Sequence, residues 1–282
     1  MTIAIASGKG GTGKTWLATN LAALFSQSRP VLLVDMDVEE PNDHIFIAGD
    51  TVSTLDARRM IPVWEQNQCI FCGECSVHCN FNAIIQLHQT IAIFDQLCHG
   101  CFACAELCPT NALTMRPHQI GKITETVKDN LRLIEGCLNP GEEQPVPLIH
   151  QLHQMATLNH GRYPVHLYDC PPGTSCPVVE ATKQADYVIL VTEPTPFGLN
   201  DIHLAVKTMR LLGKEFGVVI NRDGIGDNQV ETYCLREKIK ILGRIPYHRQ
   251  IAETSYRGEL MFNHPVIAKK LQNIIDAIPG KS

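Results

Sequence analysis

The sequence has no long apolar run, no excess of positive charge and few aromatic residues, and each lack argues against a class of protein. No apolar stretch approaches the roughly 18 residues that a helix needs to span a bilayer. The formal net charge of -5 provides no overall attraction to nucleic-acid phosphates or anionic lipid. Aromatic residues make up 6%, beside 44% hydrophobic and 19% charged residues, which is typical of a globular chain and not of a disordered or fibrous one.

The N-terminal residues also lack a targeting signal. Met1 leads directly into the apolar run 2–6 and a glycine-rich loop, which leaves no room for a basic region followed by a hydrophobic signal core. We therefore expect a cytoplasmic protein. In that reducing compartment twelve cysteines are not expected to form a disulfide framework, and eight of them lie between Cys69 and Cys108.

Short apolar runs that alternate with helical patterns predict an α/β fold. The first 37 residues are typical of strand, loop, helix and strand, which is a βαβ unit with a buried parallel sheet. The same rhythm returns later, with apolar runs at 165–168, 187–192, 216–220 and 241–245. This pattern predicts a doubly wound, mainly parallel sheet, and 282 residues have room for a second, smaller domain.

The smaller domain is expected as an insertion over residues 63–116, where the composition changes abruptly. Within it, the run Cys69-Ile70-Phe71-Cys72-Gly73-Glu74-Cys75 followed by Cys79 recurs as Cys98-His99-Gly100-Cys101-Phe102-Ala103-Cys104 followed by Cys108. The insert is therefore an internal duplication. We assign residues 1–62 and 117–282 to the main domain, and expect a hairpin at 123–134 and a helix at 146–158.

A phosphate-binding loop follows the first predicted strand. It has the sequence Gly8-Lys9-Gly10-Gly11-Thr12-Gly13-Lys14-Thr15, which satisfies G-x-x-x-x-G-K-[ST] between a strand and a helix. The glycines let backbone amides close around phosphate oxygens at a helix N-terminus, where the dipole favours anions. Lys14 is expected to neutralise the β- and γ-phosphates, and the Thr15 hydroxyl to ligate Mg²⁺.

With its additional Lys9, this loop resembles the deviant Walker A motif of the MinD, ParA, Mrp and nitrogenase iron protein superfamily. The resemblance covers nearly the whole chain and implies a MinD-like P-loop ATPase fold with Mg²⁺-dependent ATP hydrolysis that is slow without a partner. It also implies an ATP-dependent homodimer, or a heterodimer with a paralogous ATPase, in which Lys9 reaches the phosphates bound by the other subunit.

The resemblance extends to residues that follow later strands. Asp37, in Asp35-Met36-Asp37, matches the residue that orients the attacking water. Asp169 matches the Walker B carboxylate that holds Mg²⁺ through a water, and the amide of Gly173 matches a sensor of the γ-phosphate. Asn221 matches an adenine-contacting asparagine, and Gly224 stands where a guanine-specifying motif has aspartate, which favours ATP over GTP.

The cysteine insert resembles bacterial two-cluster ferredoxins, in which three cysteines of each run and the fourth cysteine of the other run hold one [4Fe-4S] cluster. The resemblance implies one cluster on Cys69, Cys72, Cys75 and Cys108, and a second on Cys98, Cys101, Cys104 and Cys79. Structural zinc is the competing metal, although zinc sites usually draw ligands from two separated pairs. A purely structural role for the clusters is a further alternative.

The leading hypothesis is a nucleotide switch that gates electron transfer through the two clusters to a redox partner protein or a metallocofactor. The alternatives are an iron-sulfur cluster carrier or scaffold, and a spatial-organisation ATPase like MinD and ParA, although neither a nucleic-acid nor a membrane signal is strong. A third cluster, bridging two subunits through Cys176 and Cys137, is an additional possibility that the nitrogenase iron protein suggests.

Overall fold

The protein, seen here as a computed structural model that describes residues 1–280, divides into two compact units. The sheet unit consists of Met1–Thr54, Ile123–Cys137 and the chain from Ile149 onward. The cysteine unit consists of Leu55–Lys122 and Leu138–Leu148. The cysteine unit contains more residues than the range 63–116 expected for the insert. Parts of the two long strands that lead to and from the cysteines belong to it, and so does the segment Leu138–Leu148.

A nine-stranded sheet has the order β11-β10-β9-β1-β8-β2-β7-β6-β3. The first seven strands in this order, which run across the sheet from β11 to β7, pair in parallel. Strands β7 and β6 are neighbours in the sheet and form the hairpin expected near residues 123–134. The strands are β1 (Thr2–Ala6), β2 (Val31–Asp35), β3 (Asp50–Trp64), β6 (Leu113–Lys128), β7 (Leu131–Leu138), β8 (Val165–Asp169), β9 (Tyr187–Thr192), β10 (Phe216–Asp223) and β11 (Ile241–Pro246).

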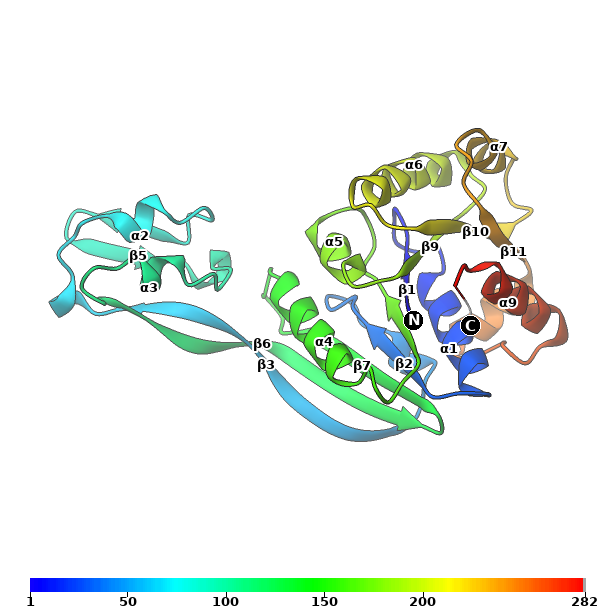
Figure 1. Ribbon diagram of the computed structural model, residues 1–282, viewed down its shortest axis with the longest axis horizontal. Helices are drawn as coiled ribbons and strands as arrows, with labels where there is room; N and C mark the ends of the chain where they lie inside the picture. The colour runs from blue at the N-terminus through cyan, green and yellow to red at the C-terminus, as the bar shows by residue number, and fades with distance from the viewer. Residues whose placement is uncertain (281–282) are drawn as a thin grey trace. The chain divides into compact units, whose positions relative to one another are not determined.

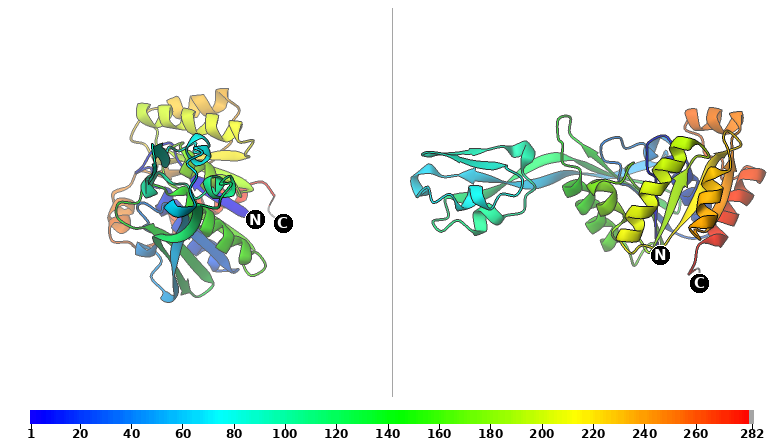
Figure 2. Two further views of the ribbon diagram at one scale, coloured as in Figure 1. Left: turned by 90° about the vertical axis from the view of Figure 1, so that its left-hand side faces the viewer. Right: turned by 90° about the horizontal axis from the view of Figure 1, so that it is seen from above.

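Helices cover both faces of this sheet, with α1 and α9 on one face and α4, α5 and α6 on the other (Figures 1 and 2). This is the doubly wound α/β architecture that the alternating sequence pattern predicts. The helices are α1 (Lys14–Ser26), α4 (Val146–Leu158), α5 (Cys176–Thr182), α6 (Pro196–Leu211), α7 (Gln229–Arg236), α8 (Arg249–Tyr256) and α9 (Pro265–Ala277), with a 3₁₀ turn at Asp43–Ile45.

The core between the sheet and helices α1 and α9 follows the two-residue period of a strand. Ile3 and Ile5 of β1 face this core, and Leu17 of α1 and Leu271 of α9 pack against them. Ala4 lies between the two isoleucines and is equally buried, because a strand with helices on both faces has no solvent side. The apolar face of α9 therefore packs into the core of the sheet unit. Among residues 1–280, no helix is long and apolar enough to cross a membrane.

The cysteine unit is built from short repeated pieces. These are the hairpin of β4 (Ile84–Leu87) and β5 (Thr90–Ile93), the helices α2 (Glu74–Val77) and α3 (Ala103–Glu106), and 3₁₀ turns at Gln66–Gln68 and Asp95–Leu97. The duplication is visible in the backbone, since Phe71 and Gly100 have φ of 56° and 67°, and Asn82 and Asn111 have φ of 52° and 54°. Glycine adopts a left-handed conformation without strain and asparagine tolerates it, so three of these four positions suit their residues.

His166 makes the sheet unit sensitive to acid. The side chain is buried on β8, and burial, followed by the charge of nearby His160, lowers its pKa from 6.5 to about 4. Between these values the unfolded chain binds a proton that the folded chain does not, so stability falls as the pH drops from 6.5 to 4. We expect this residue to cost up to about 3 kcal/mol across that window.

The variant His166→Leu tests this contribution. Denaturant unfolding of both proteins at several pH values should show a difference in unfolding free energy that changes between pH 6.5 and 4 and is flat above pH 7. A constant difference at all pH values would contradict the prediction.

Candidate functional site

The loop 8–15 connects β1 to α1, and its last glycine is held tightly. Gly13 has a φ of 91°, and helix α1 begins at the next residue, Lys14. A Cβ atom on Gly13 would lie 2.3 Å from Nδ2 of Asn221. That amide donates a hydrogen bond of 2.7 Å to the carbonyl oxygen of Thr12, so the end of β10 is tied to the loop. Asn221 therefore holds the loop in shape as well as lying beside it.

Two acidic residues stand at the carboxyl ends of neighbouring parallel strands. Asp35 of β2 is directly opposite Asp169 of β8, and Asp169 is opposite Ile5 of β1. The Thr15 hydroxyl donates a hydrogen bond of 2.6 Å to Oδ2 of Asp169. The geometry thus brings together the two residues, Thr15 and Asp169, that the sequence assigns to a Mg²⁺ ion.

The segment after β2 is folded around the carboxylate of Asp35. Its oxygens accept backbone N–H bonds from Asp37 (3.0 Å), Asn42 (2.8 Å) and Asp43 (3.1 Å). Asp43 is also buried, and oxygens of Asp35, Asp43 and Asp169 lie within 4.8 Å of one another. Sequence reasoning missed Asp43, because an aspartate in a loop gives no local sign that it will be buried.

This concentration of acid groups shifts their protonation. Burial raises the pKa of Asp37 to about 6 and that of Asp169 to about 7, and the positive charge of Lys14 opposes both shifts. For Asp43, burial and then the charges of Asp35 and Asp169 raise the pKa well above its usual range. Burial is the largest cause of each shift, and a positive charge placed beside these carboxyl groups would lower their pKa values again.

Lys9 and Gly173 lie near the loop in defined positions. Nζ of Lys9 is 3.4 Å from Oε2 of Glu193, whose other oxygen pairs with Arg222. The backbone N–H of Gly173 donates to the carbonyl oxygen of Ser7, with a φ of 96° that favours glycine. Glu193 is a second residue that the sequence did not single out, since it is distant from Lys9 along the chain.

A cavity of about 460 Å³ opens beside the loop. Gly13 and Asn221 line its edge, and its other walls come from β11 and α8 and the residues near them. Its lining consists of Gly13, Trp16, Asn221, Arg222, Pro246, Tyr247, His248, Ile251, Ala252 and Ser255. A base attached to phosphates in the loop would find mixed apolar and polar walls here, which is the usual lining of a ligand pocket.

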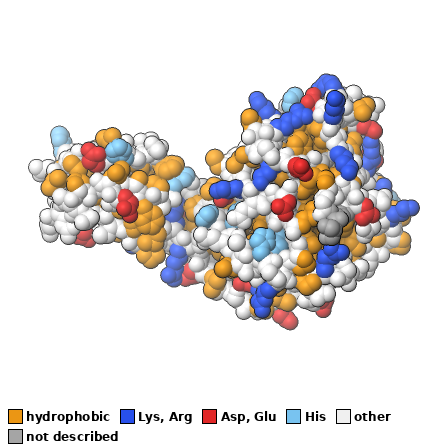
Figure 3. All heavy atoms as spheres, in the orientation of Figure 1, with side chains coloured by type: hydrophobic (Ala, Val, Ile, Leu, Met, Phe, Trp, Pro, Cys, Tyr) orange, Lys and Arg blue, Asp and Glu red, His pale blue; other side chains and the backbone are white. Residues whose placement is uncertain are grey.

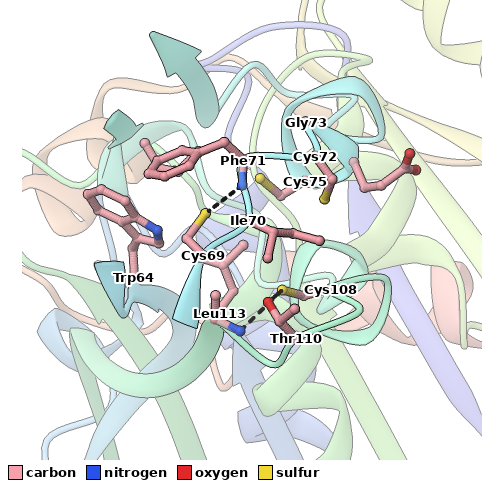
Figure 4. Close-up of a pocket in the computed structure, with 13 residues that line it drawn as sticks. Trp64, Cys69, Ile70, Phe71, Cys72, Gly73, Cys75, Cys108, Thr110 and Leu113 are labelled. Carbon is pink, nitrogen blue, oxygen red and sulfur yellow. Dashed lines mark hydrogen bonds between the residues drawn. The ribbon is translucent and has the colours of Figure 1, made fainter. Parts of the chain in front are cut away.

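The eight clustered cysteines form two pockets in the cysteine unit. One is lined by Cys69, Cys72, Cys75 and Cys108, whose sulfur atoms turn toward a common space (Figure 4). The other is lined by Cys79, Cys98, Cys101 and Cys104. These are the same two groups of four that the ferredoxin resemblance implies.

Backbone amides point at the sulfur atoms in a repeated arrangement. Phe71 N–H donates to Sγ of Cys69 at 3.4 Å, and Gly100 N–H donates to Sγ of Cys98 at 3.4 Å. In the same way Ala83 N–H donates to Cys79 and Ala112 N–H to Cys108. Such bonds stabilise sulfur that carries negative charge, as cysteinate ligands do. The donor set and its amide bonds therefore fit four-iron clusters.

The remaining cysteines and histidines fall into separate environments. Cys170 and Cys234 are buried in the sheet unit. Cys176 is exposed at the start of α5, and Cys137 is exposed on β7. His99 is half-buried and stacks on Phe81 with ring centroids 3.7 Å apart.

Comparison with known proteins identifies the family of this chain. A family model described as the CobQ/CobB/MinD/ParA nucleotide binding domain matches residues 3–261. The chain belongs to this family. The septum site-determining protein MinD of Pyrococcus horikoshii, complexed with Mg-ADP, shares the fold with a TM-score of 0.61, 21% identity and coverage of 98% of this chain and 94% of that one.

Some proteins of similar sequence match nearly the whole chain, and others match only a short part of it. An uncharacterized protein of Methanocaldococcus jannaschii is 30% identical over 285 residues, which are 99% of this chain and 96% of that protein. The iron-sulfur cluster carrier protein of Aquifex aeolicus is 23% identical over 98% of this chain and 68% of its own length. A ferredoxin-type protein of Methanocaldococcus jannaschii matches only 50 residues, at 40% identity, covering 18% of this chain and 32% of its own length.

The family's loop is expected to tolerate no side chain at Gly13. In Gly13→Ala the new Cβ meets the Asn221 amide and the left-handed backbone is strained, so we expect a loss of about 2 to 4 kcal/mol in unfolding free energy. Gly10→Ala is the matched control, because no atom lies within 4 Å of a Cβ there. Denaturant unfolding of the two variants should separate them clearly, and equal losses would contradict the prediction.

If the eight cysteines hold iron, its removal is expected to loosen the cysteine unit and leave the sheet unit folded. Two apolar clusters of this unit are small and pack against the cysteines, so a bound metal would replace part of a core. Burial raises the pKa of Cys104 to about 11, so without iron this residue is an uncharged thiol. Hydrogen exchange after chelation should rise within residues 55–122 and stay low in β1, β8 and β9; a uniform rise would argue against the prediction.

Proposed function

We propose that this family member is an ATP-hydrolysing switch that couples its nucleotide state to electron transfer through two [4Fe-4S] clusters to a redox partner. In this proposal the amides of residues 8–15 and Lys14 hold the phosphates, and Thr15 and Asp169 hold Mg²⁺. Asp37 orients the attacking water, and Asn221 borders the adenine. Gly173 senses the γ-phosphate after its backbone N–H leaves the carbonyl oxygen of Ser7. The bound clusters supply one-electron transfer at low potential.

The observation that carries the proposal is that one continuous segment runs from the loop after β2, through β3, to a cysteine pocket. The Asp35 carboxylate organises the loop up to Asp43, and the chain then enters β3 at Asp50. Strand β3 ends at Trp64, which lines the pocket of Cys69, Cys72, Cys75 and Cys108. In this proposal a change at the loop that faces the nucleotide is passed along the strand that leads to the clusters.

The surface of the cysteine unit supports contact with a partner protein. Cys72 and Cys101, one cysteine of each group, are exposed. Large hydrophobic side chains are also exposed on this unit, where Figure 3 shows few charged groups among them. They include Ile70, Val77, Phe94, Phe102 and Leu107. Exposed apolar area close to the clusters suits a redox protein that must approach within electron-transfer distance.

Measurement of the cluster potentials and of the rate of electron delivery to an acceptor, with and without Mg-ATP, tests the coupling. We expect ATP to change at least one of the two quantities in the wild-type protein and neither in Lys14→Ala, which loses the phosphate contact. Identical values with and without ATP in the wild type would refute coupling.

A dimer step is testable through Lys9. Within its own chain Lys9 pairs with Glu193, which also pairs with Arg222, so Lys9 must leave Glu193 to reach a second subunit. We expect Lys9→Ala to abolish ATP-dependent dimerisation. We expect Glu193→Gln to form dimers at an about two- to fivefold lower protein concentration, because a partly exposed ion pair contributes up to about 1 kcal/mol. Light scattering with Mg-ATP and a slowly hydrolysed analogue measures both; dimers in Lys9→Ala would remove this role.

Cluster carriage is the second candidate, favoured by the similarity to an iron-sulfur cluster carrier protein along 98% of this chain. Against it, only one cysteine, Cys234, lies beyond residue 176, so there is no C-terminal C-x-x-C pair for a transferable cluster. Incubation of the iron-loaded protein with an apo-acceptor separates the two. Loss of iron and sulfide to the acceptor supports carriage, and retention during repeated reduction supports electron transfer.

A further inference from the structure

The parts of the two cysteine pockets that the duplicated repeats supply are nearly equivalent, but β3 places a different residue beside each pocket. The amide bonds to sulfur from Phe71 and Ala83 correspond to those from Gly100 and Ala112. Strand β3 precedes the repeats, so the duplication does not constrain what it places beside each pocket. Its residues are the first place where the electrostatics of the pockets can differ.

At one pocket β3 places a neutral donor. Trp64 lines the pocket of Cys69, Cys72, Cys75 and Cys108, and its ring meets that of Phe71 edge to face at 6.3 Å (Figure 4). Its Nε1–H is buried and has no hydrogen-bond partner among residues 1–280. An indole supplies a hydrogen bond without a net charge.

At the other pocket β3 places a cation. Arg59 is 3% exposed and lies behind the loop that begins with Cys98, where a Cβ on Gly100 would be 3.1 Å from Cγ of Arg59. Nη2 of Arg59 donates to the carbonyl oxygen of Asp95, three residues before Cys98, and pairs with Glu142 at 3.3 Å. Arg59 thus holds the segment that supplies the first ligand of this pocket.

Two donors of this buried guanidinium remain to be satisfied. Nε and Nη1 of Arg59 have no hydrogen-bond partner within the described part of the chain. An unpaired buried donor on a charged group is costly, so an acceptor that arrives with the cluster is favoured.

We propose that Arg59 raises the reduction potential of the cluster held by Cys98, Cys101, Cys104 and Cys79 above that of the other cluster. This inference rests on the proposed function in one respect, that both pockets carry [4Fe-4S] clusters. Each cluster accepts one electron from an external one-electron donor and becomes more negative by one charge. A nearby cation and N–H···S bonds favour the reduced form, and hydrogen bonds and charge are known determinants of cluster potential.

Glu142 reduces the effect of Arg59 on the cluster potential, so its removal should shift that potential in the opposite direction to the removal of Arg59. Its carboxylate partly offsets the Arg59 charge, and it also pairs with His118 at 2.7 Å. Removal of the carboxylate charge should therefore strengthen the field of Arg59 on the cluster. Electrons that enter the unit come to rest on the Cys98 group, and the Cys69 group is reduced at lower potential.

A redox titration of the full chain, followed by electron paramagnetic resonance after anaerobic iron loading, measures both potentials. Cys101→Ser and Cys72→Ser, equivalent positions of the two repeats, assign each signal to its pocket. In Arg59→Gln we expect the reduced-to-oxidised ratio of the Cys98 cluster at fixed potential to fall about tenfold, which is 59 mV for one electron. In Glu142→Gln the ratio should rise, and in both variants the Cys69 cluster should stay unchanged.

Trp64→Phe is the matched control, and it should move only the Cys69 cluster. Equal potentials in the wild type, or unchanged Cys98 potentials in Arg59→Gln and Glu142→Gln with full iron content, would overturn the inference. If Arg59→Gln does not retain iron, Glu142→Gln alone decides, with a rise supporting the inference and no change overturning it. A wild-type protein that binds no iron and sulfide would instead refute the proposed function, so the two failures are distinct.

Discussion

The hydrogen bonds to the Asp35 carboxylate are the constraint on which the rest of the structure depends. They fix the backbone of residues 37, 42 and 43 in a loop at the end of β2, which places Asp37 beside the phosphate loop and points the chain toward β3. Three hydrogen bonds to one side chain hold a segment that has only a single 3₁₀ turn of its own. Without this carboxylate neither the nucleotide site nor the start of the long strand would have a defined position.

The same loop concentrates acid groups where a protein normally avoids them. Asp35, Asp43 and Asp169 are buried within 4.8 Å of one another, and Lys14 is the cation that opposes the raised pKa of Asp37 and Asp169. Burial of acid groups side by side disfavours their charged forms, and either a proton or a nearby positive charge reduces this cost.

The cysteine unit has smaller apolar clusters than the sheet unit, and they lie beside the cysteines. Its apolar clusters contain few buried side chains, among them Ile61, Ile84 and Leu113, and most of their neighbours are the cysteines themselves. A unit of this size has too little apolar area to fold firmly on burial alone, so metal binding supplies folding free energy. Near the pockets, Nε1 of Trp64 and both Nε and Nη1 of Arg59 are buried and have no hydrogen-bond partner among residues 1–280.

The sequence by itself determined the features that depend on local spacing. The phosphate loop, the alternation of strands and helices, the hairpin near 123–134, the helix at 146–158 and the duplicated cysteine runs are set by neighbours within a few residues, and the structure contains each of them. The tertiary structure alone decided that Glu193 pairs with Lys9, that Asp43 is buried beside Asp169, and that Arg59 lies behind Cys98. These partners are far apart along the chain, and their contacts arise from strand order and loop packing, which no local pattern of residue types encodes.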